Sequence, residues 1–251
     1  MAKAWLEAAW PVSAKVHGFT TLRHGLGVSQ APFDEFNLGL RAGDEPHAVQ
    51  RNRSLLTEHA NLPAGPCWLR QVHGVAVERF NAPCSEEREA DAAVTSAPGT
   101  VLAILTADCM PVLFCADDGS EIGAAHAGWR GLAGGVLENT LAAMRTSPRN
   151  VRAWLGPAAG PQRYEIGEEV FEAFVTRDPE AASAFTPTRL GHWRVDLYAL
   201  ARRRLTAVGV PAANIDGGGL CTISEPDRFF SHRRDQRTGR MASLIWIEPA
   251  R

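Results

Sequence analysis

The stretch from Leu102 to Gly135 constrains the fold most strongly, because two apolar runs flank a polar turn sequence within it. The runs cover residues 111–116 and 121–126, and the tetrapeptide Asp-Asp-Gly-Ser separates them. An Asp-Gly pair between two such runs favours a tight β-hairpin. The sequence therefore predicts that the two runs pair antiparallel.

The register of this hairpin decides which residue faces His126, at the end of the second run. A turn centred on Asp118-Gly119 places His126 opposite Pro111, whereas a turn centred one residue earlier places it opposite Cys109. Either register brings the Cys109 thiol and the His126 imidazole to one end of the ladder, at the spacing of about 4.5–5.5 Å typical of opposed residues. The pair is compatible with a catalytic dyad or with half of a metal site.

Strand and helix patterns alternate irregularly along the rest of the chain. A strand followed by a long shaped loop is expected over 19–43, and Gly74 is expected to break a strand region over 67–80. This mixture favours an α+β fold, an α/β sandwich, with residues 1–251 forming one domain of mixed β-sheets flanked by helices. Further strands are expected at 92–95, 151–155, 192–195, 220–223 and 241–247, and helices at 46–60 (capped by Asp44), 131–146, 165–175 and after a cap at Asp196.

Composition narrows the class of protein. The chain has 251 residues, of which 45% are hydrophobic and 22% charged, as in an ordinary soluble globular protein. A net charge of −2 argues against a general nucleic-acid binder, and there is no apolar run of about 18 residues to span a membrane. The N-terminus does not resemble a signal peptide, and five scattered cysteines without a CxxC pair favour a reducing, cytoplasmic setting.

Three residues are candidate metal ligands. His73 lies in Arg-Gln-Val-His-Gly, Cys109 follows Ala-Asp, and His126 opens His-Ala-Gly-Trp-Arg. Two imidazoles and a thiolate match the three protein ligands of a catalytic zinc site, which keeps a fourth position open. Their wide spacing fits a catalytic site better than a structural one, whose ligands come in close pairs.

Several motifs in the chain resemble the laccase-domain family, whose members are variously labelled polyphenol oxidase, purine nucleoside phosphorylase and peptidoglycan editing factor. The resemblance covers about residues 19–247 and implies a single α/β sandwich domain with one zinc, held by His73, Cys109 and His126. The chain departs from the family pattern at the pocket rim, where TLRHGLGVS is one residue longer and His232 and Gln236 replace an expected tyrosine and glycine. The motifs are RQVHG, ADAAVTSAPGTVLAILTADCMPVLF, HAGWRGLAGGV, GPAAGPQRYEIGEEV and SHRRDQRTGRMASLIWI.

Other residues within these motifs are candidates for catalysis or substrate binding. Asp108, next to Cys109, is expected either to orient the site or act as a general base, or else to satisfy backbone amides in a turn. His24 and His232 lie in loops that could line the pocket. Phosphorolysis needs a cationic cradle for phosphate. The motif arginines Arg23, Arg70, Arg130, Arg233 and Arg234 are therefore candidate substrate-binding residues. Gln71 is a further candidate, because it lies next to the ligand region in the same motif as His73.

The resemblance implies a zinc enzyme that cleaves adenosine, inosine or methylthioadenosine with phosphate and also deaminates adenosine. Its partners would be small molecules, a nucleoside and phosphate, rather than nucleic acid or membrane, and the chain would be a monomer or weak homodimer. A zinc hydrolase that removes a misincorporated amino acid from a peptidoglycan precursor is an alternative, as is a binding module without catalysis. A copper polyphenol oxidase fits less well, because eight histidines without a His-Cys-His string fall short of the roughly ten that a multicopper centre needs.

Overall fold

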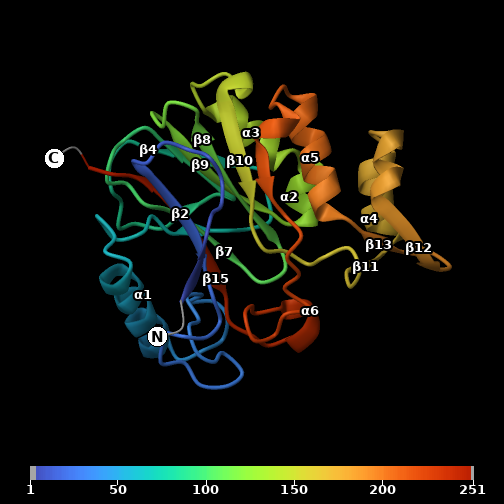
Figure 1. The fold of residues 1–251 in the computed structure, drawn as a ribbon. Coiled ribbons are helices and arrows are strands. Elements are labelled where there is room, and N and C mark those ends of the chain that lie inside the picture. Colours follow the sequence, from blue (N-terminus) through green and yellow to red (C-terminus); the bar gives the residue numbers. More distant parts are fainter. Residues whose placement is uncertain (1–3, 250–251) are drawn as a thin grey trace.

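The predicted hairpin lies at the centre of the larger of two stacked sheets in the computed structural model, which describes residues 4–249 (Figure 1). Strands β8 (Met110–Ala116) and β9 (Ile122–Ala127) pair antiparallel, with Pro111 opposite His126. The turn is therefore centred on Asp118-Gly119, the first of the two predicted registers. Gly119 has a φ of 68°, a conformation that glycine adopts without strain.

Six strands form the larger sheet, in the order β14-β10-β8-β9-β6-β4, and four form the other, in the order β1-β2-β15-β7. The β4–β6 and β10–β14 pairs are parallel and the remaining pairs in these two sheets are antiparallel. The remaining strands of the larger sheet are β4 (Val77–Phe80), β6 (Ala92–Thr95), β10 (Val151–Leu155) and β14 (Ile215–Gly217). The smaller sheet consists of β1 (Trp5–Glu7), β2 (Val16–Thr21), β7 (Leu102–Thr106) and β15 (Met241–Ile247).

The central strands are apolar throughout because both of their faces are covered. Alternate side chains of a strand point to opposite faces of the sheet. Val112 and Phe114 of β8 pack in the core beneath the helices, whereas Leu113 and Cys115 pack between the two sheets. The expected α/β sandwich is confirmed, with the sheet-to-sheet core at its centre.

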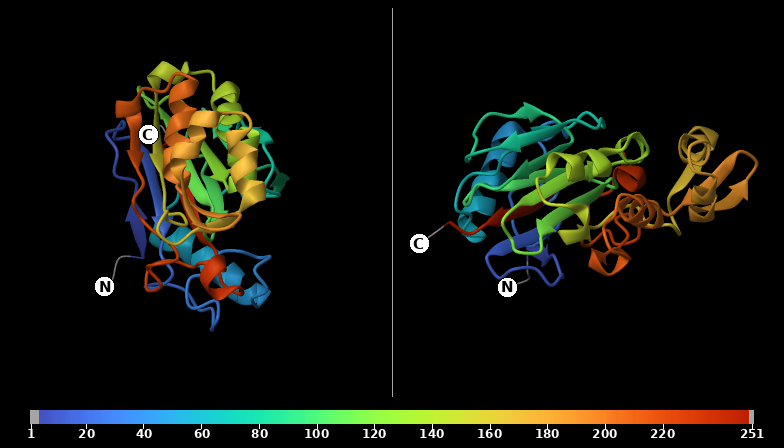
Figure 2. Two further views of the ribbon diagram at one scale, coloured as in Figure 1. Left: turned by 90° about the vertical axis from the view of Figure 1, so that its right-hand side faces the viewer. Right: turned by 90° about the horizontal axis from the view of Figure 1, so that it is seen from above.

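Helices cover both outer faces of the sandwich (Figures 1 and 2). Three helices lie on the larger sheet: α2 (Trp129–Gly134), α3 (Val136–Ala143) and α5 (Leu197–Ala207). As predicted, Asp196 caps α5, because its side chain accepts a hydrogen bond from the Ala199 amide. Helix α1 (Pro46–His59) covers the smaller sheet. No helix within residues 4–249 is both long and apolar enough to cross a membrane.

A small lobe projects from the main body at the right of Figure 1. It contains helix α4 (Glu168–Val175) and the sheet β11-β13-β12, with β11 at Glu165–Gly167, β12 at Phe185–Arg189 and β13 at His192–Val195. The other short elements are the strand pair β3 (Leu69–Arg70) and β5 (Arg88–Glu89), helix α6 (His232–Asp235), and 3-10 turns at Pro148–Asn150, Pro179–Ala184 and Ala212–Asn214.

Four sequence predictions about local structure are wrong. The helix expected over 131–146 is two helices, α2 and α3, because Gly135 has a φ of 101° that breaks the helical path. The helix expected from 165 begins three residues later, after β11. The strand expected at 220–223 is a turn with one isolated bridge, and Asp44 does not cap α1, since its Oδ2 binds Ser29 and Asn37 instead.

Candidate metal centre and its pocket

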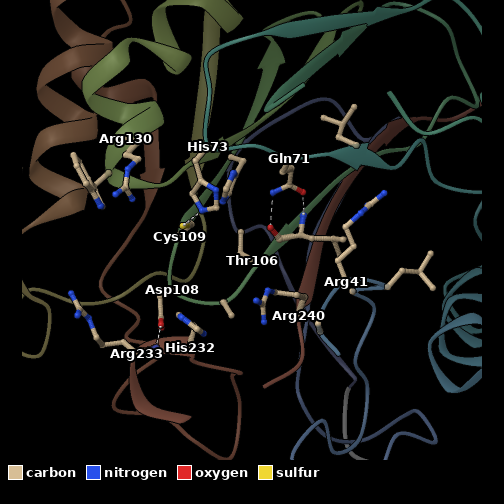
Figure 3. A pocket seen from close by; sticks show the side chains of 18 of the residues that line it. Arg41, Gln71, His73, Thr106, Asp108, Cys109, Arg130, His232, Arg233 and Arg240 are labelled. Atoms are coloured by element: carbon tan, nitrogen blue, oxygen red, sulfur yellow. Dashed lines mark hydrogen bonds between the residues drawn. The ribbon is translucent and has the colours of Figure 1, made fainter. Parts of the chain in front are cut away.

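A pocket of about 560 Å³ opens where the loop after β7 meets the start of α2 and the segment around α6 (Figure 3). Cys109 lies in the loop from β7, a strand of the smaller sheet, to β8, a strand of the larger one. The pocket is therefore located where the chain crosses between the sheets. Its lining includes His73, Cys109, His126, Trp129, Tyr164, His232, Asp108, Gln71 and five arginines, Arg41, Arg53, Arg130, Arg233 and Arg240.

The three predicted ligand residues meet in this pocket. One ligand atom from each of His73, Cys109 and His126 lies within 4.8 Å of the other two. Nε2 of His73 is 3.8 Å from Sγ of Cys109, and the two imidazole rings are 4.8 Å apart, edge to face. The group could hold a metal ion, because its donors are the thiolate and imidazoles that zinc prefers and they converge on one point.

Asp91, just before β6, holds two of these three residues in place. Its buried carboxylate accepts a 2.8 Å hydrogen bond from Nδ1 of His126 and a 2.9 Å bond from the backbone amide of His73. Because Nδ1 of His126 is engaged in this way, Nε2 is left as the ligating atom. The amides of Val72 and Gly74 also donate to Asp91, which fixes the left-handed turn at His73, where φ is 61°.

Cys109 and His126 stabilise each other's charged form. Burial alone would raise the pKa of Cys109, but the adjacent His126 and His73 lower it to about 6. Burial would likewise lower the pKa of His126, yet the Cys109 thiolate and Asp91 raise it to about 9. The thiolate required of a metal ligand is therefore the stable form of Cys109 near neutral pH.

Gly128 leaves room for the Cys109 side chain. A Cβ at position 128 would lie 2.8 Å from Sγ of Cys109 and 3.2 Å from Cδ2 of His73. Such contacts are far inside van der Waals distance, so only glycine fits beside the thiol without displacing it.

Only two of the five arginines proposed from the motifs line the pocket. Arg130 lies 4.3 Å over the ring of Trp129, and Arg233 lies over Tyr164 while donating from its guanidinium to the Glu165 carbonyl. The other three lie outside the lining. Arg23 binds Asp34, Arg70 pairs with Glu89, and Arg234 donates to Asp235 and to the carbonyls of Thr222 and Phe229.

Gln71 and Asp108 both line the pocket, but their polar atoms already have protein partners. The Gln71 amide exchanges two 2.8 Å hydrogen bonds with the backbone of Leu105. Asp108 accepts 2.6 Å bonds from the Thr222 hydroxyl and from the backbone amide of Arg233. These contacts match the interpretation of Asp108 as a residue that satisfies backbone groups and holds loops together.

Sequence reasoning missed several residues that shape the site. Asp91 is the most important of them, and its only local signal is a carboxylate directly before a buried Ala-Ala-Val strand. Arg41 and Arg53 lie outside the motifs considered, Arg240 lies inside the last of them, and only folding brings the three together. Of the two histidines suggested for the rim, His232 lines the pocket, whereas His24 lies 3.8 Å from Glu35 outside it.

The chain is similar to several proteins of known name or structure. It is 61% identical to a purine nucleoside phosphorylase of Xylella fastidiosa (strain 9a5c), over 96% of both chains. It is 50% identical to a purine nucleoside phosphorylase of Pseudomonas aeruginosa, over 98% of this chain and 99% of the relative. A third protein of that name, from Escherichia coli (strain K12), is 48% identical over 95% of this chain and 96% of its own.

Two solved structures share the fold closely. A Neisseria meningitidis protein of the DUF152 family superimposes with a TM-score of 0.93 at 47% identity, covering 98% of this chain and 100% of its own. YlmD of Geobacillus stearothermophilus gives a TM-score of 0.92 at 32% identity, covering 99% and 98%. Residues 16–248 match one family along nearly the whole chain. The chain therefore belongs to the family described as multi-copper polyphenol oxidoreductase laccase, as the resemblance of its motifs implied.

Proposed function

We propose that this protein is a purine nucleoside phosphorylase that holds one zinc ion on His73, Cys109 and His126. The observation that carries the proposal is the convergence of these three ligand atoms within 4.8 Å in an arginine-lined pocket. The names of relatives up to 61% identical over nearly the full length support the same reaction.

This set of three ligands fits a single zinc site better than it fits a multicopper centre. Imidazole and thiolate are both zinc ligands, and catalytic zinc keeps three protein ligands and one open position. A multicopper oxidase needs several metal sites, whereas residues 4–249 contain a single cluster of three such ligands. The family's description as an oxidoreductase therefore finds little support in the ligands of this chain.

In phosphorolysis a phosphate oxygen bonds to C1′ of the ribose while the bond from C1′ to the purine breaks. The purine leaves with the electron pair and takes up a proton. When bound, zinc supplies a Lewis acid that polarises a coordinated ligand. The residues of the chain must therefore hold the phosphate against C1′ and compensate its negative charge.

Arg130 is suited to bind this phosphate. It lines the pocket beside the candidate metal group, and within residues 4–249 its guanidinium forms no hydrogen bond or ion pair. Stacking on Trp129 holds the guanidinium plane while leaving its N–H groups available. Arg233 has one guanidinium nitrogen engaged by Glu165 and could add a second, weaker contact.

We also propose that the same pocket deaminates adenosine. Inosine and methylthioadenosine are proposed as further substrates for phosphorolysis. Purified protein would be incubated with adenosine, with and without phosphate, while adenine, ribose 1-phosphate and inosine are measured alongside the zinc content. We expect phosphate-dependent release of adenine and phosphate-independent formation of inosine.

Two cysteine variants complete the experiment, one at the candidate ligand and one as its matched control. Cys109→Ala should lose both products and the bound zinc, whereas Cys84→Ala, at a half-buried cysteine outside the pocket, should keep them. Equal turnover by the wild type and Cys109→Ala would contradict the proposal.

A further inference from the structure

The pocket has a second cationic region across from Arg130 and Arg233. Figure 3 shows Arg240 and Arg41 on the side of Thr106 opposite those two residues. Arg53, from helix α1, lines the same pocket and is close enough to Arg41 for the two charges to repel. The phosphate site proposed above does not involve this region.

One short segment, Asn37–Gly39, holds Arg53 and Arg240 in place. The Leu38 carbonyl accepts a 3.0 Å hydrogen bond from Nε of Arg53, and the Leu38 amide donates to the Arg240 carbonyl at 3.1 Å. The buried Asn37 side chain accepts 2.9 Å bonds from the amides of both Gly39 and Arg240. Two arginines from distant parts of the sequence are thus fixed to the same three residues.

Gly39 is required by this arrangement. A Cβ at position 39 would lie 2.6 Å from Cγ of Arg240 and 3.0 Å from its Cβ. The stem of Arg240 therefore passes directly over Gly39, which directs its guanidinium into the pocket.

Neither arginine has an acidic partner in the part of the chain that the structure describes. Within residues 4–249, no carboxylate forms an ion pair with Arg53 or Arg240. The nearby Glu87 is engaged by Arg41 through hydrogen bonds of 2.8 and 2.5 Å, and both oxygens of Asp108 are occupied. Burying a cation without a counter-ion is costly, so the pair provides a favourable place for an anion.

The two side chains keep donors available for such an anion. Arg53 uses only Nε, with its guanidinium stacked 3.9 Å from the Trp68 ring, and Arg240 uses only Nη1 among its guanidinium nitrogens, on the Thr238 and Gly239 carbonyls. Burial lowers the pKa of Arg53 to about 10 and also lowers that of Arg240, although the negative charges of Glu87 and Asp108 act in the opposite direction. Both remain protonated at neutral pH.

We propose that Arg53 and Arg240 form a second anion subsite that binds a phosphate group in the pocket of the candidate metal centre. Forked guanidinium donors match the oxygens of phosphate. The group could be free phosphate or a phosphoryl group attached to the nucleoside. The subsite extends the ligand class of the proposed function, but it is a statement about binding and does not depend on turnover.

The test is calorimetric titration of the zinc-loaded full chain with adenosine, adenosine 5′-monophosphate and inorganic phosphate. If the subsite holds a phosphoryl group of the ligand, the nucleotide should bind about tenfold or more tightly than adenosine, the effect of one charge-assisted hydrogen bond. Arg53→Gln and Arg240→Gln should each remove that advantage and leave adenosine binding unchanged. Arg51→Gln, at an exposed position of the same helix, is the matched control.

The outcomes separate the two sources of the anion. A nucleotide advantage lost in both variants identifies a phosphorylated ligand. Without a nucleotide advantage, a phosphate stoichiometry that falls in both variants to the one site proposed at Arg130 identifies free phosphate. Undetectable binding of both anions by the wild type, or binding unchanged in the two variants, would overturn the proposal.

Two further variants guard against a misfolded protein. Arg53→Lys keeps the charge and should retain part of the binding, whereas Gly39→Ala displaces the Arg240 stem and should weaken it. A protein that binds the anion through these arginines but shows no phosphorolysis would disprove only the proposed function.

Discussion

Asp91 and His126 are joined by a buried hydrogen bond of 2.8 Å between the carboxylate Oδ1 and the imidazole Nδ1. The same carboxylate also receives three backbone amides of the turn that carries His73. One side chain therefore sets the positions of two of the three candidate metal ligands. Residues with this orienting role usually change metal affinity by one to two orders of magnitude when they are replaced.

We expect Asp91→Asn to weaken zinc binding by about 10- to 100-fold. An asparagine presents an NH₂ group where one carboxylate oxygen accepted, so it cannot serve all four donors. Competition with a chromophoric chelator would measure the affinity. Asp227→Asn, at an exposed position, is the control, and an affinity equal to that of the wild type in Asp91→Asn would contradict the orienting role.

Gly128→Ala should disturb the metal group without a charge change. The added methyl would lie 2.8 Å from Sγ of Cys109, so the thiol must move. We expect at least a tenfold loss of zinc affinity, consistent with about 1.4 kcal/mol for a misplaced ligand. Gly65→Ala, where a Cβ would meet nothing within 4 Å, should bind zinc as the wild type does.

Replacing Arg130 and Arg234 should have opposite consequences for activity and stability. Arg130→Gln removes a guanidinium that forms no hydrogen bond with residues 4–249, so we expect kcat/KM for phosphorolysis to fall about 10- to 100-fold while Tm is unchanged. Arg234→Gln breaks bonds to Thr222, Phe229 and Asp235, and should lower the free energy of unfolding by roughly 2 kcal/mol. Steady-state kinetics and thermal denaturation would distinguish these effects, and a large Tm loss in Arg130→Gln would count against its assignment to phosphate.

Glu121 should make the free energy of unfolding depend on pH. Burial tends to raise its pKa, but Arg79 and the Thr146 and Arg145 groups that bind it lower the pKa overall. A carboxyl with a depressed pKa in the folded state stabilises the fold above its unfolded value, near 4.3, and loses this contribution as pH falls through the folded value.

We therefore expect Glu121→Gln to cost about 2 kcal/mol of unfolding free energy at pH 7. The difference from the wild type should shrink as pH falls below about 4, where the wild-type carboxyl also becomes protonated. Urea denaturation at several pH values would measure it. A difference independent of pH would show that the carboxylate charge of Glu121 is not what stabilises the fold.

The sequence predicted the part of the site that depends on local pattern. The Asp-Gly turn and its two apolar runs were sufficient to place Cys109 and His126 at one end of a ladder, and the observed pairing of Pro111 with His126 is one of the two expected registers. The position of His73 came instead from the family resemblance, because its turn is shaped by Asp91, which lies in a different segment.

The other residues of the pocket are brought together by tertiary contacts, which short-range sequence patterns do not predict. Arg234 looked like Arg233 in sequence, yet one binds backbone carbonyls and the other lines the pocket. Arg53 and Arg240 come from opposite ends of the chain and meet only through Leu38. The helix break at Gly135 was missed for a different reason, since Gly134 and Gly135 form a Gly-Gly pair, a local turn signal that the helix prediction overlooked.

The turn that carries His73 is shaped by Asp91, which lies outside the β8–β9 hairpin, and this dependence has a consequence for how the protein would acquire a metal ion. The hairpin alone brings Cys109 and His126 together, so a partly folded chain offers two of the three candidate ligands. We therefore expect full affinity for the ion only after folding, unlike in a zinc finger, where the ion drives folding. The apolar core between the sheets does not include these ligands, and a chelator should therefore strip the ion while the sandwich remains folded.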